Sequence, residues 1–117
     1  YMLMPVLSAC VGMKLLPELD FAAAFARLDE ISADYGVEGE DPFAKETARK
    51  LQGKVGVCYG LGLEAGLVAN RWRCQFNENA KYLLFDNAFP ELCHNEIMGW
   101  VAADRQADRY AGVILTF

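Results

Sequence analysis

Histidine is nearly absent from this sequence of 117 residues, which contains a single one, His94. Catalytic zinc sites usually use three protein ligands, chiefly histidine and carboxylate side chains, so one histidine argues against a metal mechanism. Four cysteines lie far apart and show no C-x-x-C spacing, which argues against paired-cysteine metal and redox motifs. We therefore expect no metal site, and reduced thiols that pack as small apolar side chains.

Runs of basic residues and long apolar segments are also lacking. Eleven Lys and Arg residues against sixteen Asp and Glu residues leave a net charge of -5, so we expect neither nucleic acid nor an anionic membrane surface as a partner. No apolar stretch approaches the roughly 20 residues of a membrane helix, and no signal-peptide pattern opens the chain. These absences favour a soluble, cytoplasmic protein.

The apolar residues that are present, 54% of the total, are enough for one hydrophobic core. The length predicts one domain covering residues 1–117. The sequence starts at Tyr1 and stops at Phe117, within an apolar run that has no cap or polar tail. From these ends we expect a fragment of a longer polypeptide.

Hydrophobic periodicity and breaker residues predict alternating strands and helices in the second half of the chain. Asp41-Pro42 has the chemistry of a helix start. The Asp side chain can accept a hydrogen bond from an unpaired amide of the first turn, and Pro at the first helical position has no N–H that needs a partner. The expected helices are 3–16, 20–31, one from 41 to Gly53, 64–80 and 95–103; the expected strands are 54–59, 82–85 and 110–117; the expected loops are 32–40, 60–62 and 87–94.

The expected strands are too apolar to have a solvent-exposed face, and helices separate them. This pattern predicts an α/β fold, a three-layer αβα sandwich around a parallel sheet. Ligands of such sheets bind beyond the carboxyl ends of the strands, which places Gly60–Gly62 and Asn87–His94 on one rim. The glycines of Gly60–Gly66 do not match the dinucleotide-binding spacing. We interpret them as a tight turn with close packing.

Two residues are candidates for chemistry. Glu78 would share a helix face with Arg71 and Gln75 and would lie in the last turn, where exposed carbonyls disfavour a carboxylate and so strengthen it as a base. His94 is expected in a loop on the same rim as Glu78. From the pattern alone, Glu78 could equally be a solvated helix end capped by Asn79, and His94 an ordinary surface or core residue.

Three segments resemble the archaeal and bacterial bifunctional phosphoglucose/phosphomannose isomerases. They are Gln75-Phe-Asn-Glu-Asn-Ala-Lys81, Pro90-Glu-Leu-Cys-His-Asn95 and Gly99-Trp100. These proteins carry two sugar isomerase (SIS) domains with a flavodoxin-like sheet, and this chain is similar to most of the second one, in truncated form. The resemblance runs from about Leu3 to Phe117 and is loose before Phe43.

The resemblance implies that Glu78 is the catalytic base, that His94 opens the sugar ring, and that Gln75 and Asn95 belong to the substrate-binding surroundings. It also implies a metal-free, cofactor-free cis-enediol isomerisation of glucose or mannose 6-phosphate to fructose 6-phosphate. In the family, a homodimer shares the active site, with the histidine supplied by the partner. Ser/Thr loops of the first SIS domain hold the phosphate, and a catalytic lysine lies near the C-terminus, both outside this sequence.

Two alternatives remain open at this point. One is a SIS-type sensor that binds a phosphosugar without converting it, and the other is an interaction domain in which the motifs are incidental. A base at Glu78 separates the enzyme from the sensor, because a sensor has no need of one.

Overall fold

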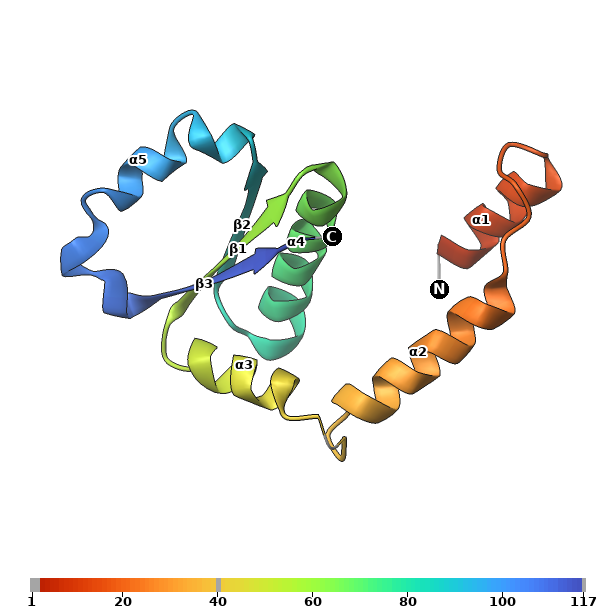
Figure 1. The fold of residues 1–117 in the computed structure, drawn as a ribbon, viewed down its shortest axis with the longest axis horizontal. Helices are drawn as coiled ribbons and strands as arrows, with labels where there is room; N and C mark the ends of the chain where they lie inside the picture. The colour runs from red at the N-terminus through yellow and green to blue at the C-terminus, as the bar shows by residue number, and fades with distance from the viewer. Residues whose placement is uncertain (1–2, 40, 117) are drawn as a thin grey trace. The chain divides into compact units, whose positions relative to one another are not determined.

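A computed structural model describes residues 3–39 and 41–116. The contacts divide the chain into two compact units, residues 1–44 and residues 45–117 (Figure 1). Each unit is described by itself. The predicted loop 32–40 ends at Glu40 and the predicted strand 110–117 ends at Phe117. Both of these end residues lie outside the described residues.

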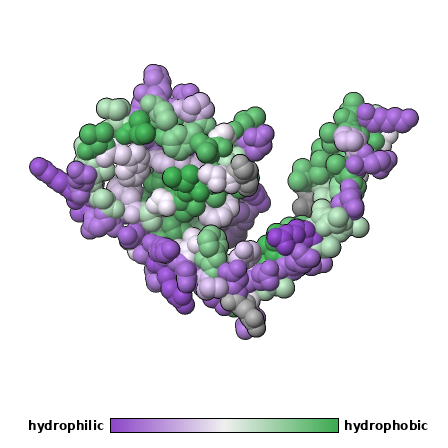
Figure 2. All heavy atoms as spheres, in the orientation of Figure 1, coloured by the Kyte–Doolittle hydropathy of each residue, from purple (hydrophilic) through white to green (hydrophobic). Residues whose placement is uncertain are grey.

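The first unit contains helices α1 (Leu3–Gly12) and α2 (Phe21–Tyr35). Asp20 caps α2 by accepting a hydrogen bond of 2.9 Å from the amide of Ala23. None of the residues of α1 is buried, although the helix is almost wholly apolar, and Figure 2 shows hydrophobic residues gathered over it. α2 extends past the predicted end at Ile31 because Ser32 to Tyr35 still form helical turns, and the helix stops at Gly36.

The second unit is built on a parallel sheet of three strands in the order β2-β1-β3. The strands are β1 (Val55–Leu61), β2 (Leu84–Phe89) and β3 (Tyr110–Leu115). β1 pairs with β2 from Gly56↔Leu84 to Leu61↔Phe89, and with β3 on its other edge. The predicted α/β fold with a parallel sheet is confirmed.

One face of this sheet is covered by helix α4 (Leu63–Gln75). Successive side chains of a strand point to opposite faces, and Cys58 and Leu84 point toward α4, where each has 0% of its surface exposed. Ala65 and Ala69 are the buried residues of the helix, as its three- and four-residue spacing predicts. The driest core of the unit therefore lies between α4 and the sheet.

The opposite face is covered by the connection from β2 to β3, residues 91–109, which contains α5 (Glu96–Trp100) and three short 3-10 turns. The step from β1 to β2 and the return past β1 to β3 move in opposite directions. Right-handed crossovers therefore place α4 and this connection on opposite faces, which agrees with Figure 1. The second covering layer is thin, since α5 has five residues and the predicted helix 95–103 is too long.

Helix α3 (Phe43–Leu51) precedes β1 and begins as its sequence predicts, because Asp41 accepts a 2.7 Å hydrogen bond from the amide of Phe43. The predicted position of β2, residues 82–85, is wrong. The strand instead includes Asp86 and Asn87, which the sequence analysis placed partly in a loop. These polar side chains are tolerated in the strand because each has partners on its own face of the sheet.

Candidate functional site

Glu78 lies in a π-helical turn, Phe76–Ala80, that continues α4 at the edge of the sheet where β2 begins. Its side chain is exposed. The turn ends at Lys81, whose φ of 52° is left-handed, and the Lys81 ammonium donates to the carbonyl oxygen of Glu78. Glu78 is thus an exposed carboxylate on a short, constrained turn.

Asn77 ties this turn to the sheet. Its amide accepts from the Leu84 N–H at 2.9 Å and donates to the Leu84 carbonyl at 3.3 Å. A side-chain amide here copies the pairing of a neighbouring strand. The rings of Phe76 and Tyr82 pack edge to face with centroids 5.8 Å apart, and the Tyr82 hydroxyl donates to the Leu51 carbonyl at 3.0 Å. The backbone that carries Glu78 is therefore anchored in the apolar core.

Gln75 lies one turn before Glu78 and is half-buried. Its amide stands between the guanidinium of Arg71 and the amide of Asn79. Because a guanidinium can only donate, the Gln75 oxygen faces Arg71, with Nε 3.1 Å away. Gln75 is thus held within the α4 surface on the Glu78 side of the sheet.

His94 lies beyond the other end of β2, in the connection 91–109. Leu92, with 1% of its surface exposed, anchors the preceding 3-10 turn, and the His94 amide donates to the Glu91 carbonyl at 3.0 Å. The His94 side chain is exposed, as is that of Asn95, which precedes α5 and makes no side-chain capping bond. The imidazole is presented to solvent rather than packed.

The prediction that Glu78 and His94 share one rim is wrong. Helix α4 starts beside the carboxyl end of β1, at Gly62, and runs back along the sheet, so its last turn returns to the amino ends of the strands. His94 follows the carboxyl end of β2. The four predicted site residues therefore form two pairs, Gln75 with Glu78 and His94 with Asn95, separated by the length of β2.

The expected close packing of the glycine-rich turn after β1 is confirmed. A Cβ added to Gly60 would lie 2.2 Å from the backbone carbonyl carbon of Ala65 and the amide nitrogen of Gly66. Gly62 has a φ of 90°, which favours glycine. This turn brings α4 against the end of β1 and is structural.

A polar cluster on the α5 face was not found by sequence reasoning. The Tyr59 hydroxyl donates to Glu96, the Asn87 amide donates to the other carboxylate oxygen of Glu96 at 2.6 Å, and the Trp100 indole N–H donates to the Tyr59 hydroxyl at 2.7 Å. We call these four residues the Glu96 cluster. The one available signal was Asn87, which together with Asp86 interrupts an apolar segment.

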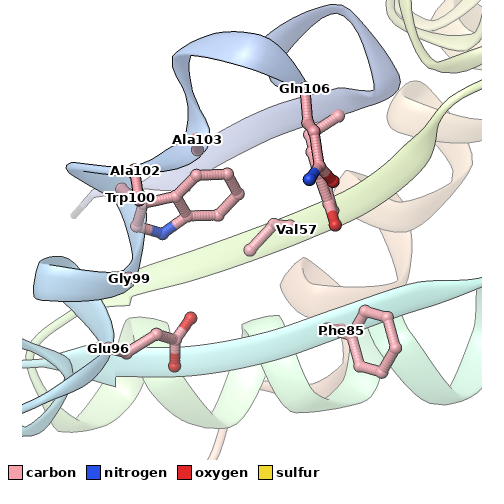
Figure 3. A pocket seen from close by; sticks show the side chains of 9 residues that line it. Val57, Phe85, Glu96, Gly99, Trp100, Ala102, Ala103 and Gln106 are labelled. Atoms are coloured by element: carbon pink, nitrogen blue, oxygen red, sulfur yellow. The ribbon is translucent and has the colours of Figure 1, made fainter.

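Two residues of the Glu96 cluster, Glu96 and Trp100, line an open pocket of about 490 Å³ between the sheet and the connection 91–109. Figure 3 shows Val57 of β1, Phe85 of β2 and Trp100 facing the same space, with the carboxylate of Glu96 at its edge. Burial, followed by the hydrogen bond to Glu96, raises the pKa of Tyr59 to about 12. The phenol thus stays protonated and able to donate at neutral pH.

On the α4 face, Asp86 pairs with the guanidinium of Arg73 and accepts from Asn70 at 3.3 Å. Burial, with a smaller contribution from Asp86, raises the pKa of the Cys58 thiol to about 11, so Cys58 is a neutral core side chain. Within the described residues, no three His, Cys, Asp or Glu side chains gather in a group that could hold a metal ion.

Residues 40–116 match the family model described as the bacterial phospho-glucose isomerase C-terminal SIS domain. The chain belongs to this family. The match spans the sheet, α4 and the connection 91–109, and thus both the Glu78 and the His94 segments. The family resemblance inferred from the sequence motifs is confirmed.

Curated relatives of this SIS domain are named bifunctional phosphoglucose/phosphomannose isomerases. The protein of Caldicellulosiruptor bescii is 32% identical over 103 residues, 85% of this chain and 30% of the relative. The protein of Thermoplasma volcanium is 36% identical over 98 residues, 84% and 30% respectively. That of Aquifex aeolicus is 43% identical over 56 residues, 48% and 17% respectively.

The chain thus spans less than a third of the length of these relatives. No solved structure gives a significant match to it. Among the helices that the structure describes, none has both the length and the apolar character needed to cross a membrane.

Proposed function

We propose that this SIS domain supplies the base and the ring-opening residue of an aldose–ketose isomerase acting on glucose 6-phosphate and mannose 6-phosphate. The observation that carries the proposal is the family match over residues 40–116, which includes Glu78 and His94. The names of the relatives support the substrate class. Residues 1–117 are then one partial C-terminal SIS domain, which agrees with relatives that align over 84–85% of the chain.

In the proposed reaction, His94 exchanges the proton that opens the pyranose. Glu78 then removes the C2 proton of the open-chain aldose, a proton passes from the C2 hydroxyl to the C1 oxygen, and Glu78 returns its proton to C1 of the cis-enediol. Rotation about C2–C3 lets one base serve both the glucose and the mannose epimers. Gln75 and Asn95 form part of the substrate surroundings, and the chemistry uses no redox cofactor.

The geometry favours two copies of the chain in each active site. Glu78 and His94 are both exposed and lie at opposite ends of β2, so a single copy offers them in different directions. We propose a homodimer in which Glu78 of one copy and His94 of the other meet at one hexose. In this arrangement the two residues can act on one substrate only after two copies of the chain have assembled.

The direct test is deuterium exchange at C2 of glucose 6-phosphate in heavy water, with the protein at its natural length. We expect Glu78→Gln to slow exchange by about 1,000-fold, within the range for loss of a general base. Glu46→Gln, an exposed glutamate on α3, is the matched control and leaves the rate unchanged. Exchange that survives in Glu78→Gln would remove the catalytic assignment of Glu78, and an original protein that binds the substrate without any exchange would favour the phosphosugar sensor.

The proposed role of His94 has its own test. We expect His94→Ala to slow conversion of ring-closed glucose 6-phosphate much more than conversion of an open-chain analogue, because only the ring-closed substrate needs the opening step. Equal losses on the two substrates would contradict ring opening by His94 without affecting the role of Glu78.

A further inference from the structure

The Glu96 cluster links the connection 91–109 to the sheet through side-chain hydrogen bonds. Both carboxylate oxygens of Glu96 accept a hydrogen bond, one from Tyr59 of β1 and one from Asn87 of β2. Trp100, one turn further along α5, donates to the same Tyr59 hydroxyl. Glu96 thus joins α5 to two strands at once.

The donors that hold Glu96 are neutral and fixed. In residues 3–39 and 41–116, no ion pair is described for Glu96, and its two donors come from strands rather than from flexible surface side chains. Tyr59, Glu96 and Trp100 are half-buried, and hydrogen bonds to a charged acceptor in such a setting are stronger than average. The carboxylate therefore has one well-defined place.

His94 lies midway between two anchors. Two positions before it, Leu92 is buried with 1% of its surface exposed, and two positions after it, Glu96 is held by the sheet. For His94 itself, the contact described is a backbone one, from its amide to the carbonyl of Glu91. The place of the exposed imidazole is therefore determined by the backbone between Leu92 and Glu96.

We propose that Glu96, held by Tyr59 and Asn87, is a positioning residue for His94, fixing the backbone from which the imidazole reaches a ring-closed hexose phosphate. This inference rests on the proposed ring-opening role of His94. Glu96 does not touch the sugar. It restrains an irregular connection, together with the buried Leu92 and the Trp100–Tyr59 hydrogen bond. A misplaced catalytic group can cost about 100-fold in rate.

The test compares Glu96→Ala with Glu91→Ala in the protein at its natural length. Glu91 is an exposed glutamate on the same connection, and the substitution keeps the carbonyl that accepts from the His94 amide. We expect Glu96→Ala to lower kcat on ring-closed glucose 6-phosphate by about 10- to 100-fold. Its kcat on an open-chain analogue stays within about threefold, KM stays near the original value, and Glu91→Ala changes neither rate.

Glu96→Gln keeps the size of the side chain and carries the test if Glu96→Ala does not fold. The Gln side chain has one oxygen and can replace only one of the two acceptors. The kcat of Glu96→Gln on the ring-closed substrate should therefore fall between the kcat of the original protein and that of His94→Ala. The imidazole NMR signal that is absent from His94→Ala should shift or broaden in both Glu96 variants and not in Glu91→Ala.

Two residues that act through one step are not additive. His94→Ala/Glu96→Ala should therefore be no slower than His94→Ala alone on the ring-closed substrate. The proposal is overturned if Glu96→Ala slows both substrates equally, or if the double variant loses the product of the two single losses. If His94→Ala itself shows no preference between the substrates, the ring-opening role fails and this proposal fails with it. A normal His94 result with no Glu96 effect rejects the positioning role alone.

Discussion

The two ends of strand β2 carry the two candidate catalytic residues and are built in different ways. At the amino end, the turn with Glu78 is tied to the driest core through Asn77, which pairs with the backbone of Leu84. At the carboxyl end, His94 lies on an irregular connection held by Leu92 and by the polar Glu96 cluster.

The difference shows how one small sheet can position two residues by separate physical means. The turn that carries Glu78, the proposed base, is tied by Asn77 to a strand that is fixed by apolar packing, which is stiff and sensitive to volume. The connection that carries the exposed His94 is held by Leu92 and by the hydrogen bonds of the Glu96 cluster, which are directional but individually weaker. Substitutions should therefore separate the two ends, in stability as well as in activity.

The largest expected effect is on the packed end. Leu84→Ala leaves a cavity in place of a side chain that has 0% of its surface exposed. It should lower the free energy of unfolding by about 4 kcal/mol. Leu92→Ala, at 1% exposure on the thin connection, should cost about half as much because the irregular segment can collapse toward the gap. Urea unfolding measures both, and an equal or larger cost for Leu92→Ala would break the comparison.

Alkaline pH tests the packed face through Cys58. Burial raises its pKa from 9.0 to about 11, so the unfolded thiol ionises first. The stabilising contribution is complete below pH 9 and is lost as pH rises toward 11, at about 1.4 kcal/mol per pH unit. Unfolding at pH 9 and pH 10 should show this fall, and Cys58→Ala should flatten it. A Cys58→Ala protein with an unchanged slope would contradict the assignment.

Asn77→Ala tests the amino end of β2, because it removes both hydrogen bonds to the Leu84 backbone. We expect a loss of about 2 kcal/mol, because two backbone groups of a half-buried site lose their partners. Asn79→Ala is the control. Asn79 is exposed, and its removal should cost no more than about 0.5 kcal/mol. Similar costs for the two variants would show that Asn77 does not anchor the Glu78 turn.

The smallest expected effect on stability comes from removing either of two tyrosine hydroxyls. Tyr59→Phe removes a bond to Glu96 and one from Trp100, and Tyr82→Phe removes a bond to the Leu51 carbonyl. Each should cost about 1 kcal/mol. Only Tyr59→Phe should alter the NMR signal of His94, because only that hydroxyl holds the connection 91–109. A His94 signal that responds to both, or to neither, would remove the distinction between the two ends.

Local signals in the sequence predicted much of the fold. Asp41 marked a helix start because its side chain accepts an amide hydrogen bond close by. Hydrophobic periodicity predicted the helix of which Ala65 and Ala69 are the buried residues. The family was also predictable, because the motifs around Glu78 and His94 are short and contiguous.

The rest depends on contacts between distant segments. Asp86 and Asn87 broke the apolar pattern of β2, and only their partners on α4 and α5 explain why the strand continues through them. Tyr59 and Glu96 are 37 positions apart, beyond any periodicity. The error over the shared rim came from the direction of α4, whose last turn lies at the opposite edge from its first.

The central claim, that Glu78 and His94 act across two copies, is tested most directly by a hybrid dimer of Glu78→Gln and His94→Ala subunits carrying different affinity tags. In a shared site, one of the two sites of this hybrid has both an intact Glu78 and an intact His94. We predict about half the original isomerase activity for the purified hybrid, although each parent variant is nearly inactive. A hybrid no more active than its parents would contradict the account.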